Sequence, residues 1–344
     1  MDVISILNTI RANNSAVYQE RIPEATEQNM REVGNAILAY QACTNEFLDA
    51  LVNRIAFVIV SNRRYKNPLA ILKKGTKPFG TDIEEILTNP VSAVAFNGSA
   101  TDDMLKITKP DVKTAFHRMN RQDKYPVSIS TPQLQKAFLN AGEFGSFVNS
   151  VISAMYSGDE MDEYLLMRNL VSEGITEKKV KAITLDTAYD GSEESSKALV
   201  KLAKTLSANF TFISGDYNGY NVANDAKIKA GTVTPAKTWT PKENQVLLIR
   251  SDVDACTDVE VLAKAFNMDK TKFLERKIVV DSFGDENTLM FLCDDAIFKV
   301  MDDLYQVRSF DNGSNLTTNY WLHHWQTMSL SLFGNGVAIQ NPEA

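Results

Sequence analysis

The clearest hydrophobic pattern of the chain lies near its C-terminus. Along residues 326–332 apolar and polar side chains alternate, with Met328, Leu330 and Leu332 on one face, and this is the period of a β-strand. Directly before them, residues 320–325 are aromatic or apolar on both faces. A strand of that kind has to be covered on both faces. It therefore predicts either closure of a domain by the last residues of the chain or packing against another subunit.

Two Asn-Gly pairs flank this pattern, Asn312-Gly313 and Asn335-Gly336. Asn-Gly is typical of tight hairpin turns, which require a positive φ. We therefore predict strands joined by such turns between about residues 305 and 339.

Helical spacing of apolar residues marks three segments in the first half of the chain. It covers 26–40, a second helix from about 44 to 55, and above all 143–173, whose apolar stripe predicts one long helix. Unbroken, that helix would be roughly 45 Å long at 1.5 Å per residue, and Gly174 is the residue type that commonly ends helices. Residues 1 to about 25 show no sustained pattern and predict an extended arm with one short helix at most.

After Gly174 the pattern changes to alternating strands and helices. We predict strands at 180–185, 246–249, 277–281 and 289–293, and helices at 195–206 and 259–266. This alternation indicates a second, α/β domain over roughly 181–300. The strands of 305–339 are expected to return to the first domain.

Charge is distributed unevenly along the 344 residues. The net charge of −7 argues against a protein that grips nucleic acid along its length. Residues 50–81 nevertheless contain no acidic residue and seven basic ones, whereas acidic residues concentrate at 159–163. Within the basic segment, Leu69–Leu72 favours a strand of a projecting hairpin, and the weak core pattern up to about Thr108 favours a long loop that reaches outward. The basic segment is interpreted as a subunit contact, with solvated charge or nucleic-acid binding as alternatives.

Motifs that carry chemistry are missing from the sequence. We find no phosphate-binding loop, nucleophile elbow, His-Glu-x-x-His motif or paired Cys-x-x-Cys, and the three cysteines are scattered. His323 and His324 are neighbours on a predicted strand and so point to opposite faces, which disfavours a shared metal ion. The acidic groups Asp252/Asp254, Asp294-Asp295 and Asp302-Asp303 are better explained as acidic turns that follow strands. We predict no catalytic, cofactor-binding or metal-binding residues, and no enzyme.

The order of these parts, together with four phrases, resembles the major capsid proteins of tailed bacteriophages. The phrases are MREVGN at 30–35, KNPLAILKKG at 66–75, VEVLAKAFNMDK at 259–270 and NYWLHHWQTMSLSLFGNGVAI at 319–339. The resemblance covers nearly the whole chain. It implies an α+β Hong Kong 97-type capsid fold, which encapsulins share.

The resemblance assigns each segment to a part of that fold. It implies an N-terminal arm at 1–25, P-domain helices at 26–61, an extended E-loop at 62–110, further P-domain at 111–180 with its spine helix at 143–173, an A-domain at 181–300, and returning P-domain strands at 301–344. Some family members cross-link a loop lysine to a neighbour's asparagine. Lys73, Lys74 and Lys77 lie in the corresponding loop, but no motif for that reaction is present.

The function that the resemblance implies is a shell subunit. Such proteins form pentamers and hexamers that tile an icosahedral head around double-stranded DNA. They assemble with a scaffolding protein, a portal and in some cases decoration proteins, in the host bacterial cytoplasm, and the product is the virion capsid. No membrane or cofactor is implied, and the packaged DNA would be near without specific binding. Two alternatives remain: an encapsulin-type nanocompartment shell, or an α/β ligand-binding protein or enzyme built on 181–300.

A specific contact between subunits follows from the charge pattern. We predict that the basic loop lies over the acidic residues of a neighbour's spine helix, and that apolar burial around Leu69–Leu72 supplies the stability. The predicted contact residues are Arg63, Arg64, Lys66, Leu69, Ile71, Leu72, Lys73, Lys74, Lys77, Asp159, Glu160, Asp162 and Glu163.

Overall fold

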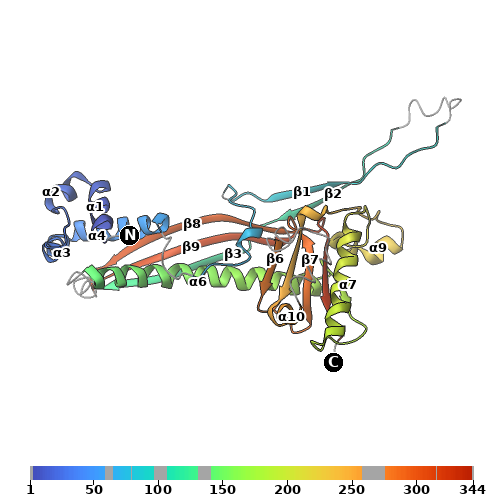
Figure 1. Cartoon of the computed structure of the whole chain (residues 1–344). Coiled ribbons are helices and arrows are strands. Elements are labelled where there is room, and N and C mark those ends of the chain that lie inside the picture. The colour runs from blue at the N-terminus through green and yellow to red at the C-terminus, as the bar shows by residue number, and fades with distance from the viewer. Residues whose placement is uncertain are drawn as a thin grey trace. The chain divides into compact units, whose positions relative to one another are not determined.

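The chain divides into two compact units, which are described separately (Figure 1). The computed structural model describes residues 3–58, 65–78, 80–96, 107–130, 141–257, 276–314 and 316–342. Unit 1 comprises Met1–Asn67, Arg121–Glu163 and Asp302–Trp325, and unit 2 comprises Pro68–Asn120, Tyr164–Met301 and Gln326–Ala344. Three long elements contribute residues to both units: α6 (Ala141–Thr176), β8 (Phe298–Asn312) and β9 (Thr317–Leu330).

Unit 1 begins with four helices: α1 (Val3–Asn13), α2 (Ala16–Arg21), α3 (Met30–Leu38) and α4 (Gln41–Val58). The last two confirm the predicted helices. The extended arm predicted for residues 1–25 is wrong, because α1 and α2 are packed helices with Leu7, Ile10 and Tyr18 buried. Ser15 caps α2 by accepting the N–H of Tyr18 at 3.2 Å. Helices this short show few apolar repeats in sequence and are stabilised mainly by tertiary packing.

A three-stranded sheet completes unit 1. Its order is β3 (Arg121–Ser130), β9, β8. Within this unit the strands lie along α6 (Figure 1), and Met155 of the helix shares one core with Tyr320 and Leu322 of β9. The opposite face of β9 is half-buried, so the single chain covers one face of this strand fully and the other only in part.

Helix α6 confirms the long helix predicted at 143–173 and extends it to 36 residues. Its end differs from the prediction. Gly174 lies inside the helix, and its carbonyl accepts the N–H groups of Lys179 and Val180, while Lys178 takes the left-handed conformation with φ 57°. A Cβ on Gly174 would lie 2.8 Å from side-chain atoms of Leu330 and Val180. Close packing, rather than a positive φ, therefore requires glycine here.

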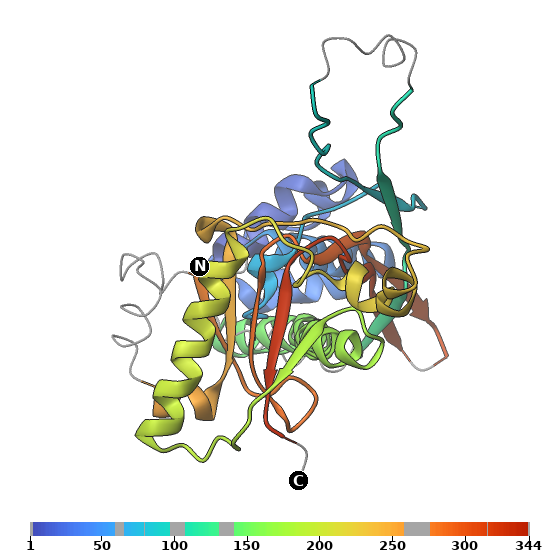
Figure 2. The same cartoon turned by 90° about the vertical axis from the view of Figure 1, so that its right-hand side faces the viewer.

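Unit 2 is built on a five-stranded mixed sheet with both faces covered. The strand order is β4 (Lys181–Thr184), β10 (Gly336–Gln340), β7 (Thr288–Asp294), β5 (Gln245–Arg250), β6 (Lys277–Val280). Alternate residues of β5 enter two cores: Leu248 packs with Met167 of α6, and Ile249 packs with Leu199 of α7 (Glu193–Phe210), which lies along the sheet in Figure 2. Strands β4, β5, β6 and β7 and helix α7 confirm the four strands and the first helix predicted after Gly174. The helix predicted at 259–266 lies outside the described residues.

The last strand was assigned wrongly from sequence. We predicted that the strands up to residue 339 return to the first domain, but β10 pairs in parallel with β4 and antiparallel with β7. The positive φ values predicted at Gly313 and Gly336 are also absent. In the β8–β9 turn it is Leu316 that takes a positive φ, of 53°. Gly336 is needed for space, because a Cβ there would lie 2.6 Å from Ile297 Cδ1.

The other elements of unit 2 are short or project from its body. Strands β1 (Ile83–Thr88) and β2 (Val112–His117) form a separate antiparallel sheet, hereafter the β1–β2 ribbon, which extends away from the five-stranded sheet in Figure 1. Short helices are α8 (Gly219–Ala223), α9 (Asp225–Lys229), α10 (Ser251–Cys256), η1 (Ala70–Leu72) and η3 (Lys242–Asn244). Among the described residues, no helix has the length and apolar content needed to cross a bilayer.

Candidate functional site

The β1–β2 ribbon buries charged side chains and exposes apolar ones at several positions. On β2, Lys113 and His117 are buried, whereas Val112 and Phe116 are 47% and 61% exposed. Ile86 of β1, which pairs with Thr114 on the same outer face, is 59% exposed. The outer face thus presents three apolar side chains to water beside Glu84 and two threonines, which makes it a candidate contact surface.

Apolar exposure continues along the chain beyond the ribbon. Val91, Val94 and Phe96 follow β1, Ile107 precedes β2, and each of them is at least three-quarters exposed. Phe96 reaches 96%. Single exposed apolar residues are ordinary, but a run of them on one projection marks an interaction surface.

A half-buried carboxylate anchors the inner face of the ribbon. Glu85 of β1 accepts hydrogen bonds from His117 Nε2 at 3.1 Å, Lys299 Nζ at 2.9 Å and Ser331 Oγ at 2.8 Å. Burial alone would raise the pKa of Glu85, but these three donors outweigh it and lower the pKa to about 2. The second nitrogen of His117 lies 2.7 Å from Ser329 Oγ. Hydrogen bonds to the charged Glu85 therefore attach the ribbon to β8 and to the end of β9.

A second anchor uses the segment after α9. Lys113 Nζ lies 3.0 Å from Asp111 Oδ1 and 2.9 Å from Thr234 Oγ1, and Thr234 in turn donates to Asp111. The hydrogen bond from Lys113 is the main cause that lowers the pKa of Asp111. Asn89 contributes further bonds to Asp111 and to the carbonyl of Pro235. These contacts fix both strands of the ribbon to the body of unit 2.

The predicted basic contact segment is only partly a surface. Arg63 and Arg64 lie outside the described residues. The segment forms η1, a 3-10 helix, where we predicted a strand. Leu69, which precedes η1, and Leu72, its last residue, are buried in the chain's own core, while Ile71 is 72% exposed. The two leucines therefore have almost no surface to offer a neighbour.

The lysines of this segment are held in part by the chain itself. Lys66 and Lys74 are exposed, and Lys73 and Lys77 are half-buried. The N–H of Lys74 bonds the carbonyl of Val300 at 2.9 Å, and Lys77 Nζ donates to the carbonyl of Thr81 at 2.6 Å. The backbone at Lys74 is thus bonded to β8, while the charged side chains of Lys66 and Lys74 remain exposed.

The predicted acidic residues of the spine helix serve mainly within unit 1. Asp159 and Glu163 are buried, and Glu160 and Asp162 are half-buried. Arg121 Nη2 donates to Asp159 at 3.0 Å, and the hydroxyl of Tyr125 donates to Asp162 at 2.9 Å. Asn67 donates its backbone N–H to Glu160 and its side-chain amide to Glu163, each at 2.9 Å. An intersubunit role for these four residues stays a prediction, and their accessible members are Glu160 and Asp162.

Arg121 is the buried cation of this network. Its guanidinium also bonds Asp123 at 2.7 Å and the hydroxyl of Tyr125 at 2.7 Å. Burial alone would lower the pKa of Arg121, but the hydrogen bond to Asp123 and the nearby acidic groups outweigh it and raise the pKa. A charge this deeply buried is tolerated because it is paired and hydrogen-bonded.

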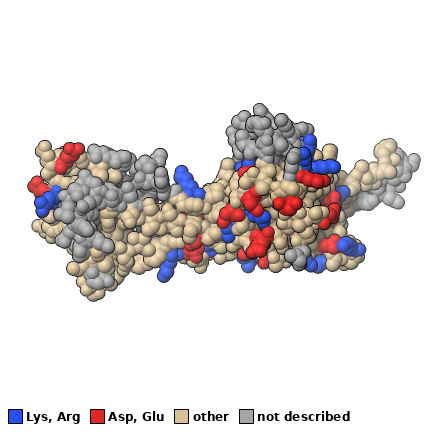
Figure 3. Space-filling model, turned by 60° about the horizontal axis from the view of Figure 1, so that its bottom comes forward, with Lys and Arg blue, Asp and Glu red and all other residues tan. Residues whose placement is uncertain are grey.

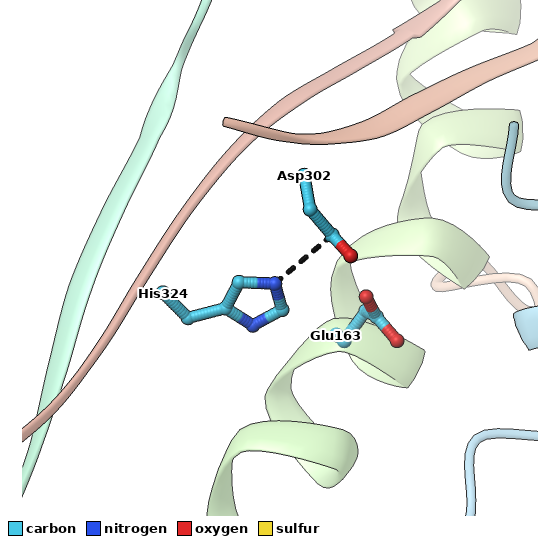
Figure 4. Close-up of side chains that lie close together, drawn as sticks. All are labelled: Glu163, Asp302 and His324. Atoms are coloured by element: carbon cyan, nitrogen blue, oxygen red, sulfur yellow. Dashed lines mark hydrogen bonds and ion pairs between the residues drawn. The ribbon is translucent and has the colours of Figure 1, made fainter. Parts of the chain in front are cut away.

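His324 forms a second group of buried polar contacts next to Asp159. Its Nδ1 lies 2.6 Å from Asp159 Oδ1, and its Nε2 lies 3.0 Å from Asp302 Oδ1. One ligand atom from each of Glu163, Asp302 and His324 lies within 4.8 Å of the other two (Figure 4). Burial alone would lower the pKa of His324, but the bonds to Asp159 and Asp302 raise it. The acidic turn predicted at Asp302-Asp303 is wrong, because both residues lie within β8.

Surface charge is mixed rather than divided into large fields. On the face drawn in Figure 3, acidic side chains gather over the part of the molecule that carries the five-stranded sheet, with Lys and Arg among them. Within unit 2, local ion pairs join Arg250 to Asp252 at 2.6 Å and Arg168 to Asp281 at 2.6 Å. This face therefore carries no continuous basic lining.

Sequence reasoning located the projecting segment but missed its apolar contacts. The outer face of the ribbon has no regular period that continues past Thr88, so Val94 and Phe96 are not distinguishable from loop residues by pattern. One signal was present: Val112 and Phe116 alternate with Lys113 and His117, which marks a two-faced strand. Which face is buried depends on Glu85 and Lys299, which lie far from β2 in the sequence.

Comparison with known sequences gives a consistent result. The model of the family described as Phi29-like phage major capsid protein matches residues 7–340. The major capsid protein of Bacillus phage B103 is 34% identical over 337 residues, covering 97% of this chain and 72% of the relative. The major capsid protein of Streptococcus phage Cp-1 is 30% identical over 356 residues, covering 96% and 92%.

Solved structures show the same fold at low sequence identity. A chain from the capsid structure of Staphylococcus phage Andhra aligns with a TM-score of 0.65 at 15% identity, covering 82% of this chain and 86% of that one. A chain from the structure of the head fibre and inner core protein gp22 of native bacteriophage P68 aligns with a TM-score of 0.59 at 14% identity, with the same coverage. The chain thus has the α+β fold of phage capsid structures, as predicted.

Proposed function

The chain belongs to the Phi29-like phage major capsid protein family, and from this membership we propose that its copies form pentamers and hexamers that tile an icosahedral head around double-stranded DNA. It is a structural protein of the phage capsid rather than an enzyme, and its place is the virion. Neither an encapsulin-type shell nor an α/β ligand-binding protein or enzyme is favoured.

The observation that carries the proposal is the apolar outer face of the β1–β2 ribbon. Ile86, Val112 and Phe116 are exposed there, while Lys113 and His117 are buried on the inner face. Burying one large apolar side chain completely contributes about 1.5–3 kcal/mol. In a ring each subunit presents the same ribbon to a neighbour, and contacts that recur around a closed ring reinforce one another.

The basic segment is proposed to guide the same contact. Lys66, Lys74 and the exposed Ile71 are the accessible described residues, and we retain Arg63 and Arg64 in the proposal. Glu160 and Asp162 are the accessible acidic candidates on a neighbour's spine helix. Exposed ion pairs contribute only about 0–1 kcal/mol each, so they would orient the subunits while the apolar face supplies the stability.

The remaining parts of the family assignment belong to the same proposal. We retain 62–110 as the E-loop, and β2 follows it in the chain. We retain 181–300 as the A-domain, and β10 adds a strand to its sheet. A scaffolding protein, a portal, possible decoration proteins and assembly in the host cytoplasm are proposed on the family resemblance. The net charge of −7 suits a container that holds DNA without binding it tightly.

Shell assembly of a double variant tests the proposal. Ile86→Ser together with Phe116→Ser removes two of the three exposed apolar side chains of the outer face, and neither native side chain can form a hydrogen bond. We expect an unchanged circular dichroism spectrum and a loss of rings and shells in sedimentation and negative-stain microscopy. Val17→Ser is the matched control, because Val17 is similarly exposed at 56% but lies on α2. Normal shell yield from the double variant would overturn the proposed contact.

A further inference from the structure

Three side chains of metal-ligand type converge inside unit 1 from three different elements. Glu163 comes from α6, Asp302 from β8 and His324 from β9 (Figure 4). The three offer two carboxylates and an imidazole, with ligand atoms within 4.8 Å of one another. The side chains of His324 and Glu163 are buried, whereas that of Asp302 is 19% exposed and leaves a route from solvent.

The imidazole is oriented as a ligand would be. Asp159 Oδ1 lies 2.6 Å from Nδ1, so it accepts the Nδ1 proton and leaves Nε2 facing Asp302 and Glu163. A carboxylate behind the ring fixes the tautomer and raises the basicity of the opposite nitrogen, which is the usual outer contact of a metal-bound histidine.

The carboxylates around the cluster are held as well. The side-chain amide of Asn67, which is itself buried, donates to Glu163 at 2.9 Å. Arg121 bonds Asp159 at 3.0 Å, and both of these side chains are only 4% exposed. The cluster is therefore a buried arrangement with its own supporting contacts, unlike a group of acidic residues on a surface.

We propose that Glu163, Asp302 and His324 bind a divalent transition-metal ion of the Zn²⁺ class. Zinc bonds to nitrogen and oxygen ligands are about 2.0–2.2 Å long, so two ligand atoms of one ion lie at most about 4.4 Å apart. The Nε2–Asp302 separation of 3.0 Å already fits. Glu163 offers a ligand atom within 4.8 Å of the other two, so a shift of no more than about 0.4 Å would bring it into range. The ion replaces the proton that Nε2 otherwise donates to Asp302, and this proton passes to solvent.

The chemistry of the ligands selects the class of ion. Mg²⁺ and Ca²⁺ prefer sites made of oxygen atoms, whereas imidazole favours Zn²⁺ and its neighbours. The bound ion would join α6, β8 and β9 at one point. It thus supplies a cross-link inside unit 1 that does not depend on the proposed contacts between subunits.

Titration of the full-length chain tests this site. Cys256 is exposed and binds Zn²⁺ readily as a thiolate, so the background carries Cys256→Ser. After treatment with a chelator, isothermal titration with ZnCl₂ is expected to saturate at one ion per chain, with no comparable heat from MgCl₂. Co²⁺ should give a visible absorption band at the same stoichiometry.

Conservative variants separate binding from folding. Asp302→Asn and Glu163→Gln keep the size of the side chain, and we expect each to weaken Zn²⁺ affinity by at least about tenfold. His323→Ala is the matched control, because His323 is adjacent on β9 but points to the other face, and its affinity should be unchanged. Absence of saturable Zn²⁺ binding, or equal affinity in both carboxylate variants and the parent, would overturn the proposal.

Discussion

The five-stranded sheet and the β1–β2 ribbon belong to the same unit but bury opposite kinds of side chain. In the five-stranded sheet, β5, β7 and β10 are apolar on both faces, and α6 and α7 cover them. In the ribbon, Glu85, Lys113 and His117 lie on the inner face, and Phe116 and Ile86 face outward. The first sheet is covered on both faces by the chain itself, whereas the second leaves Ile86, Val112 and Phe116 exposed among the described residues.

This difference separates hydrophobic burial that stabilises the folded chain from hydrophobic burial that stabilises the assembly. Apolar residues of the five-stranded sheet stabilise the folded chain, because they leave water when the chain folds. On the proposed contact, the exposed apolar residues Ile86, Val112 and Phe116 would leave water only on assembly and would contribute to the shell more than to the subunit. Substitutions in the two sheets should therefore separate folding from assembly.

The largest expected effect is on the five-stranded sheet. Phe291 of β7 is fully buried and packs edge-to-face with Phe298 at 6.2 Å between ring centroids. Phe291→Ala should lower the free energy of unfolding by about 3–5 kcal/mol, because it removes buried surface and leaves a cavity. Denaturant unfolding of the unassembled chain measures it, and Phe291→Leu serves as the milder control. A loss below about 1 kcal/mol would show that the sheet is not the stabilising core.

An intermediate effect is expected at the anchor of the ribbon. Glu85→Gln keeps the shape of the side chain but removes the charge opposite Lys299, whose side chain is only 18% exposed. We expect the free energy of unfolding to fall by about 1–3 kcal/mol, because a poorly solvated cation loses its partner. Glu84→Gln, on the exposed outer face of the same strand, is the control and should change little.

The pH dependence checks the cause of this effect. The pKa of Glu85 is lowered from 4.5 to about 2 in the folded chain, so the folded state binds the proton less readily than the unfolded state. Its stabilising contribution is complete above the unfolded value and is lost as pH falls towards about 2. Comparing the parent with Glu85→Gln by thermal unfolding between these pH values should show the difference shrink with acid. A constant difference would contradict the anchor.

The smallest effect on stability is expected on the outer face of the ribbon. Phe116→Ala should change the free energy of unfolding by less than about 0.5 kcal/mol, because the ring is already 61% exposed in the single chain. The same denaturant experiment measures it beside Phe291→Ala. A loss comparable to that of Phe291→Ala would mean that the ribbon folds back on its own chain and would remove the contrast between the two sheets.

Elements with a long or regular pattern were predictable from sequence. The stripe of α6 repeats over many turns, and the alternation of β5 and β7 is bounded by turns, so local spacing is sufficient. Helix α1 was missed although Val3, Ile6, Leu7 and Ile10 recur at helical spacing, because this repeat covers only about two turns. Helix α2 has six residues and a single buried position, Tyr18. Strand β10 was assigned to the wrong sheet because its pattern shows that it is buried but not which strands it joins.

The candidate contact surface was predictable only in outline. The lack of acidic residues around Lys66–Lys77 locates a basic, projecting segment. The inward-facing leucines Leu69 and Leu72 could not be distinguished from the exposed Ile71, because a single turn of 3-10 helix has no repeat to analyse.

By itself the sequence determined the order of elements, the long helix, the α/β segment and the resemblance to phage capsid proteins, since these depend on local spacing and on phrases of residues. Only the tertiary structure decided which charges are inside. Asp159 meets Arg121, 38 positions away, and His324, 165 positions away, and that pairing turns a predicted surface patch into a buried network. The physical reason is that a charge is tolerated in the interior only beside its partners, and those partners come from strands that folding alone brings together.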